Sequence, residues 1–204
     1  MLDTPSPRPR VSDSPALHAR AMADLRFIRE TMENASAFSA FSGPGLSVIG
    51  GIAGAAGLVA HWQPGQGRWL VAWLVAAAVS TVVGALSTAW KTRGLEQPLM
   101  PGPARKFALS LAPALFAGTL LTIALARAES FSLLPGVWLL LYGAGLVAAG
   151  AWSVKTVPQI GAAFMLLGTA ALLGPSEWGD WLLIAGFGGL HVAFGAIVGW
   201  KHGG

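Results

Sequence analysis

The chain has 204 residues, of which 54% are hydrophobic and 11% charged, and its mean hydropathy is +0.61. Soluble domains carry about a quarter charged residues, so this composition excludes an ordinary water-soluble domain and makes the lipid bilayer the expected solvent. The formal net charge is +4 and the chain contains no cysteine. Disulfides, thiolate metal sites and covalently attached c-type haem are therefore excluded.

The residues before the first apolar run are polar and lack a basic-then-apolar start, so we expect no removable signal peptide. Residues 1–13 have prolines and too little apolar content to fold, which predicts a disordered tail. Residues 14–37 predict an amphipathic juxtamembrane helix, because Ser14 can cap it and Pro15 suits its first position. Two interpretations of this helix stay open: a docking or self-association surface, or a helix that lies in the headgroup region or packs under its own bundle. Its apolar residues recur at helical spacing: Ala21, Leu25, Ile28, Met32 and Ala35.

Six apolar runs follow, each near the length that an α-helix needs to cross about 30 Å of hydrocarbon. They lack the period-two alternation of barrel strands, so we predict an all-α, polytopic transmembrane bundle over residues 38–204. The fifth run is short and starts beside Pro158, which leaves a five-span arrangement with a re-entrant segment as an alternative. The runs are 44–62, 69–90, 107–126, 134–154, 157–173 and 181–200.

The basic residues predict an orientation. Of the 13 Lys and Arg residues, all but Arg68 and Arg127 fall in connections on the same side as the two termini. Because basic loops stay in the cytoplasm, both termini are expected there. Topology thus accounts for the excess of positive charge, and no nucleic-acid partner is expected, since the N-terminal arginines alternate with acidic residues.

A candidate polar site lies near the predicted bilayer midplane. His191 falls in the middle of the last run, where an ionisable residue is costly and marks a functional hypothesis. Tyr142 in the fourth run is expected at a similar depth, where its phenol can share a hydrogen bond with the imidazole. Four further hydroxyl residues are predicted near this level: Ser80, Thr81, Thr119 and Thr169.

This midplane group admits two interpretations. As a functional site it would bind a small ligand or relay a proton. As a packing device, a neutral histidine would pair with a hydroxyl or carbonyl of the next helix, while Ser and Thr bond back to their own helix.

Glycines predict close contacts between helices. The spacings Gly50–Gly54 and Gly195–Gly199 match the GxxxG pattern, which lets helix backbones approach each other. Whether such contacts lie within the bundle or form a homo-oligomer stays open. A faint similarity between residues 50–57 and 143–150 would fit a 3+3 inverted repeat, a layout found in transporters.

The sequence predicts no catalytic, metal or cofactor site. No paired carboxylates or nucleophile–base arrangement falls in a span, and the acidic residues Glu129, Glu177 and Asp180 are interpreted as solvated loop charges. His61 and His202 are expected at opposite membrane boundaries, so haem ligation by two histidines is not expected.

Three segments resemble a known group of proteins. The segments LYGAGLVAAGAWSVKTVPQIGAAFMLLG (141–168), AGFGGLHVAFG (185–195) and LRFIRETMENASAFSA (25–40) are similar to parts of bacterial multi-span inner-membrane proteins of unknown function. The resemblance covers the chain from about Leu25 onward. It implies a bacterial inner-membrane setting and transfers no activity.

We therefore expect a non-enzymatic integral membrane protein that acts as a structural, accessory or sensory component. Its partners would be the lipid bilayer and either a second copy, another membrane protein or a cytoplasmic protein. The alternative is a small transporter or channel with its site around His191 and Tyr142. A cofactor-binding redox subunit is a third possibility, which visible absorbance of the purified protein would reveal.

The predicted orientation can be tested with single cysteines, since the chain has none of its own. We expect Gly94→Cys and Gly204→Cys to react with an impermeant thiol reagent from the cytoplasmic side, and Gly65→Cys from the opposite side. Reaction of Gly94→Cys and Gly204→Cys from opposite sides would contradict the six-span topology.

Overall fold

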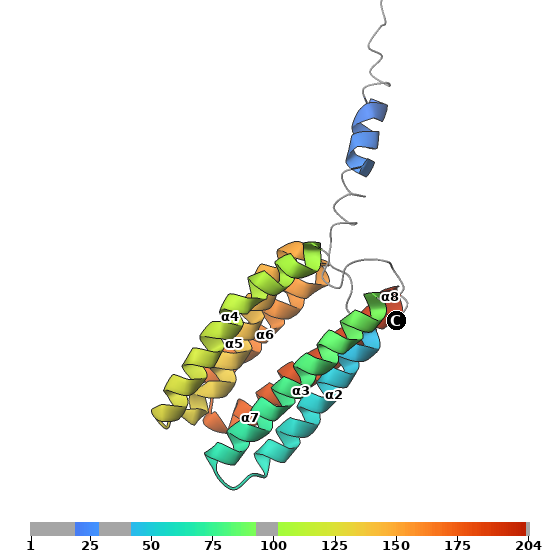
Figure 1. Ribbon diagram of the computed structural model, residues 1–204. Helices are drawn as coiled ribbons and strands as arrows, with labels where there is room; N and C mark the ends of the chain where they lie inside the picture. Colours follow the sequence, from blue (N-terminus) through green and yellow to red (C-terminus); the bar gives the residue numbers. More distant parts are fainter. Residues whose placement is uncertain (1–18, 29–41, 93–101, 203–204) are drawn as a thin grey trace, which may run out of the picture. The chain divides into compact units, whose positions relative to one another are not determined.

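Figure 1 shows the computed structural model, which describes residues 19–28, 42–92 and 102–202. Two compact units are distinguished, Met1–Ala37 and Phe38–Gly204, and each is described by itself. In the first unit, residues 19–28 form a helix with exposed apolar side chains, among them Leu25 and Ile28. The rest of the predicted juxtamembrane helix and the predicted tail lie outside the described residues.

Within its described residues the second unit is all-helical, and six of its helices are long and apolar enough to cross a membrane. The prediction of a six-helix bundle is confirmed, and the fifth run forms the unbroken 18-residue helix α6. The long helices are α2 (Gly43–His61), α3 (Gln66–Thr92), α4 (Gly102–Arg127), α5 (Leu134–Ala149) and α6 (Thr156–Leu173). The sixth span has three parts: α7 (Gly179–Leu183), the π-helix η4 (Ile184–Leu190) and α8 (His191–His202). Short 3-10 turns flank α5 and precede α7: Phe131–Leu133, Gly150–Trp152 and Ser176–Trp178.

The bundle has two ends, which we name by their helices. At the terminal end α2 begins and α8 ends, since a Cβ atom on Gly43 would come within 2.7 Å of the Gly199 nitrogen. The Lys106 ammonium lies 4.5 Å from the centre of the Trp152 ring at this end, which joins the start of α4 to the turn after α5. At the distal end α2 turns into α3 through Gly65, whose φ of +105° favours glycine.

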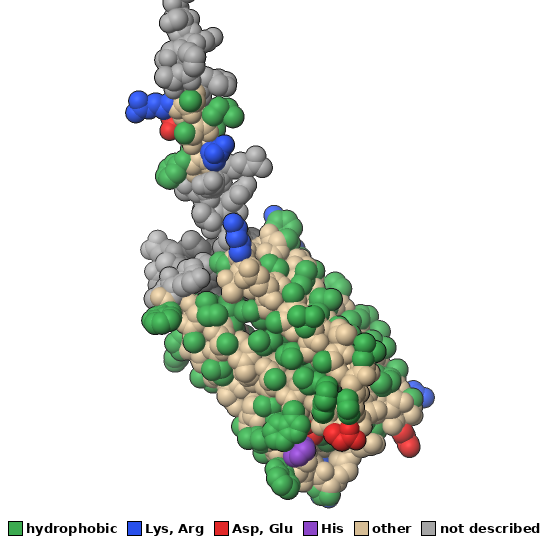
Figure 2. Space-filling view, turned by 180° about the vertical axis from the view of Figure 1, so that it is seen from behind, with side chains coloured by type: hydrophobic (Ala, Val, Ile, Leu, Met, Phe, Trp, Pro, Cys, Tyr) green, Lys and Arg blue, Asp and Glu red, His purple; other side chains and the backbone are tan. Residues whose placement is uncertain are grey.

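The side-chain distribution is that of a protein surrounded by lipid. Figure 2 shows one face of the molecule, where hydrophobic side chains cover the middle of the bundle and charged side chains lie toward its ends. Helices α3 and α4 are the least covered, with 11% and 6% of their spans buried, against 28% or more for each of the others. Lipid therefore contacts most of these two helices.

Helix α2 packs against the last span through glycines. A Cβ atom on Gly50 would lie 2.7 Å from the carbonyl oxygen of Gly188, and one on Gly195 would lie 2.6 Å from the carbonyl oxygen of Gly43. The backbones of Gly54 and Gly199 are approached in the same way, by Gly188 and Gly43. Both predicted GxxxG spacings therefore lie at contacts within the bundle: Gly50–Gly54 faces Gly188, and Gly195–Gly199 faces Gly43.

Helices α5 and α6 repeat this arrangement. A Cβ atom on Gly143 would lie 2.6 Å from the carbonyl oxygen of Gly161, and one on Gly168 would lie 2.7 Å from the nitrogen of Leu140. A Cβ atom on Gly150 would collide with the ring of Pro158. We call α2 with the last span the first pair, and α5 with α6 the second pair.

The glycine contacts inside the two pairs account for the faint similarity between residues 50–57 and 143–150. In the first span the glycines of the contact are Gly43, Gly50 and Gly57 of α2. In the fourth span they are Gly136 and Gly143 of α5 and Gly150 directly after it, so the spacing is seven residues in both spans. The partner of α2 is the last span, whereas the partner of α5 is the next span. The glycine contacts therefore do not follow a 3+3 repeat, in which the two partners would correspond.

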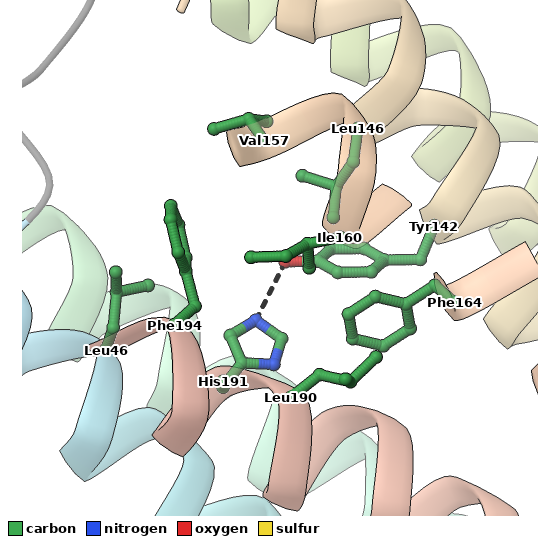
Figure 3. Close-up of a pocket in the computed structure, with 9 residues that line it drawn as sticks. All are labelled: Leu46, Tyr142, Leu146, Val157, Ile160, Phe164, Leu190, His191 and Phe194. Atoms are coloured by element: carbon green, nitrogen blue, oxygen red, sulfur yellow. Dashed lines mark hydrogen bonds between the residues drawn. The ribbon is translucent and has the colours of Figure 1, made fainter. Parts of the chain in front are cut away.

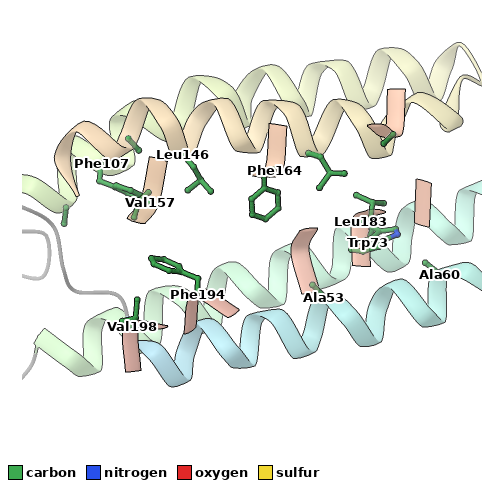
Figure 4. Close-up of a cluster of buried hydrophobic side chains, with 14 residues drawn as sticks. Ala53, Ala60, Trp73, Phe107, Leu146, Val157, Phe164, Leu183, Phe194 and Val198 are labelled. Atoms are coloured by element: carbon green, nitrogen blue, oxygen red, sulfur yellow. The ribbon is translucent and has the colours of Figure 1, made fainter. Parts of the chain in front are cut away.

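The two pairs meet along a hydrophobic interface, which we call the seam. Its largest fully buried side chains include Phe164, Val157, Leu139 and Leu183. Figure 4 shows these apolar groups facing one another from the two sides. Side chains fill the seam, whereas inside each pair the glycines bring the backbones of the two helices into contact.

The glycine contacts make a paired prediction. Gly50→Ala should lower the free energy of unfolding by about 1–3 kcal/mol, because the added methyl group collides with the backbone of the last span. Gly51→Ala is the matched control, since no atom lies within 4 Å of its added Cβ atom. Unfolding by a denaturing detergent in mixed micelles measures both, and equal effects of the two substitutions would contradict this packing.

Candidate functional site

The structure brings Tyr142 and His191 together across the seam. The Tyr142 Oη atom lies 3.0 Å from His191 Nε2, so α5 of the second pair is hydrogen-bonded to the first residue of α8 in the first pair. Figure 3 shows this bond as a dashed line. The pairing expected from the depth of the two residues is present, and we call the two residues the midplane pair.

Two phenylalanines enclose the midplane pair. The Phe164 ring lies 4.9 Å from the Tyr142 ring in an edge-on arrangement, measured between centroids, and 5.6 Å from the His191 ring. The Phe187 ring stacks on the imidazole at 6.2 Å and lies 5.2 Å from the tyrosine ring. Both polar groups are thus surrounded by hydrocarbon and aromatic faces, where an unpaired charge would be costly.

The other imidazole nitrogen is buried without a hydrogen-bond partner. Within the described residues, His191 Nδ1 shares this property with Trp73 Nε1. In a neutral imidazole one nitrogen carries the proton and the other accepts, so the tautomer sets the direction of the Tyr142–His191 bond.

A small cavity of about 30 Å³ adjoins the midplane pair on its terminal-end side. One water molecule needs about 10–15 Å³ by this measure, so the cavity has room for one or two water molecules in the present conformation. Its walls come from both sides of the seam, as Figure 3 shows. From the first pair they are Leu46, Leu190, His191 and Phe194, and from the second pair Tyr142, Leu146, Val157, Ile160 and Phe164.

The other predicted hydroxyl residues do not line this cavity. Thr81, Thr119 and Thr169 are exposed, and each donates to the carbonyl group four residues earlier in its own helix. Ser80 lies half-buried in α3. The structure therefore narrows the predicted group of six residues to Tyr142 and His191.

A second polar group, which we call the distal cluster, was not predicted from the sequence. Asp180 accepts hydrogen bonds from Trp69 Nε1 at 2.7 Å and from His61 Nδ1 at 2.9 Å. The Trp69 ring stacks on Trp138 at 5.6 Å and an interplanar angle of 12°, and Trp138 Nε1 donates to Thr122 Oγ1 at 2.8 Å. The interpretation of Asp180 as a solvated loop charge was wrong, because its carboxylate joins α7 to α2 and α3.

One signal in the sequence could have indicated the distal cluster. Trp69 and Trp138 both lie at the distal ends of their runs, and an indole N–H at a membrane boundary needs an acceptor. Asp180 lies in the first turn of α7, at the same boundary. No three His, Asp or Glu side chains come together as metal ligands within the described ranges, so the distal cluster offers a two-member His–Asp pair only.

Comparison with protein-family models, with curated proteins and with solved structures finds no match for the chain. The resemblance to bacterial multi-span proteins therefore stays a prediction.

A double-mutant cycle tests the bond across the seam. Tyr142→Phe and His191→Leu should each destabilise the bundle, with a coupling energy of about 1 kcal/mol, because hydrogen bonds between membrane helices are worth about that much. Thr119→Val is the control, since its hydroxyl bonds to its own helix. A coupling energy near zero, measured by unfolding in mixed micelles, would contradict a stabilising Tyr142–His191 bond.

Proposed function

We propose that the protein is a non-enzymatic integral membrane component of structural, accessory or sensory type. The observation that supports this most directly is the use of polar groups inside the bundle. Tyr142 with His191, and Trp138 with Thr122, join neighbouring helices, while three threonines bond to their own helix. Such groups hold a bundle together in lipid, and the cavity beside the midplane pair is too small for an ordinary organic substrate.

The setting belongs to the same proposal. The bacterial inner membrane is the setting that the resemblance to bacterial multi-span proteins implies. We propose that the terminal end of the bundle lies in the cytoplasm, because the basic residues concentrate in connections at that end. The exposed tryptophans Trp90 and Trp200 lie at this end of their spans, and Trp62 lies at the other, as expected of residues that prefer the membrane boundary.

A partner in the cytoplasm or in the membrane completes the proposal. Residues 19–28 expose Met22, Leu25 and Ile28 together with Arg20 and Arg26. A short helix of this composition suits a lipid headgroup layer or an amphipathic protein surface. A second copy of the chain remains an alternative partner.

A small transporter or channel is the second candidate function. The midplane pair favours it, because an ionisable side chain beside a cavity at mid-membrane is a common feature of proton and solute pathways. The depth of the cavity also favours it, because transporters place their substrate sites near the bilayer midplane.

Flux measurements separate the two candidates. In proteoliposomes with an imposed pH gradient we expect no proton flux above that of protein-free liposomes, and we expect His191→Leu to change stability alone. A pH-dependent flux that His191→Leu abolishes, with the fold intact by circular dichroism, would replace this proposal by the transporter. A colourless purified protein is also expected, and haem absorbance would contradict the proposal.

A further inference from the structure

The seam is built differently at its two ends. At the distal end, α7 packs against α2, α5 and α6 together. A Cβ atom on Gly179 would lie 3.0 Å from the Pro135 ring of α5, and Leu183 of the same helix is fully buried. The Asp180 hydrogen bonds join α7 to α2 and α3 on the first-pair side, and the Trp69–Trp138 stack crosses the seam from α3 to α5. At this end the seam is therefore held by the packing of α7 and by aromatic stacking.

At the terminal end apolar side chains face one another across the seam. Helix α8 packs closely on α2, where Gly195 meets the backbone of Gly43. Phe194 and Val198 of α8 face Val157 of α6 and Phe107 of α4, as Figure 4 shows. The cavity lies in this half of the seam, and apolar contacts around a cavity are weaker than contacts in a filled core.

The last span has different neighbouring helices at its two ends. Its distal part, α7, is held among three helices, and its terminal part, α8, travels with α2. The π-helix η4 joins them and contains Gly186, Gly188 and Gly189. Glycine-rich backbone with a shifted hydrogen-bond register is a place where a helix can bend, and π-helical turns are frequent at functional sites. The midplane pair lies at the terminal end of this segment, where His191 begins α8.

We propose that the seam opens at its terminal end. Helices α2 and α8 move away from the second pair, and η4 serves as the hinge between α8 and α7. The packing of α7 on α5 and α6 and the Trp69–Trp138 stack keep the distal end closed. The Tyr142–His191 hydrogen bond opposes opening. Opening widens the cavity and admits water from the terminal end to the imidazole. The proposal concerns motion within the bundle and applies to a sensory component and to a transporter alike.

Thiol accessibility tests the opening, since every cysteine is an introduced one. In nanodiscs, Ile160→Cys places a thiol on the cavity wall and Ala171→Cys places one in the distal half of α6. We expect a water-soluble thiol reagent to label position 160 slowly and position 171 not at all. Adding Tyr142→Phe should raise the rate at position 160 about fivefold, the factor that corresponds to a lost tie of about 1 kcal/mol, and leave position 171 unlabelled.

The control variant is Thr122→Val, which removes the acceptor of the Trp138 Nε1 hydrogen bond between α4 and α5. That bond does not cross the seam, and both rings of the Trp69–Trp138 stack are kept. This variant should leave the rate at position 160 unchanged. An unchanged rate with Tyr142→Phe, or labelling of position 171 to the same extent as position 160, would overturn the proposal.

Spin labels give a measurement in the otherwise unchanged protein. The labelled pair Val48–Gln159 spans the seam near its terminal end, and the pair Leu58–Leu173 spans it near the distal end, both from α2 to α6 at exposed positions. We expect a broad or two-peaked distance distribution for the first pair and a single narrow one for the second. Equal widths at the two ends would overturn the proposal even if Tyr142→Phe fails to fold.

Discussion

Close backbone contact through glycine is the interaction on which the bundle depends. Lipid is as apolar as the side chains it surrounds, so the hydrophobic effect that assembles soluble helices is nearly absent between membrane helices. Van der Waals contact must replace it, and the glycines of α2 and α5 bring backbones of two antiparallel helices within contact distance. The remaining long helices, α3 and α4, lie outside the two pairs that result and are the most exposed to lipid.

The polar chemistry follows from that division. Backbone groups of the pairs are satisfied inside their helices, so side chains supply the contacts between pairs. The Tyr142–His191 bond joins two polar groups in low-dielectric surroundings and crosses the seam. The hydrogen bonds of Asp180 are more exposed and stay on the first-pair side, where they join α7 to α2 and α3. A hydrogen-bonded imidazole beside a small cavity is compatible with a packing role and with a gating role.

Sequence reasoning succeeded for properties that depend only on position along the helix axis. The length of each apolar run is dictated by the thickness of the membrane, so all six spans were predicted. Depth along the helix axis also placed Tyr142 and His191 at one level. The same argument failed for Thr81, Thr119 and Thr169, because depth says nothing about rotation around the axis and these side chains face outward. Asp180 was misjudged because its partners come from helices far away in the chain.

The sequence by itself therefore determined the solvent, the number of helices and the depth of each residue, since these depend on local composition and on the fixed length of a span. Tertiary structure alone decided which glycine faces meet, that the last span bends through a π-helix, and that one carboxylate joins three helices at the distal end. These features depend on how each helix is rotated and which neighbour it contacts. Many arrangements satisfy the same hydropathy pattern, and packing in three dimensions selects among them.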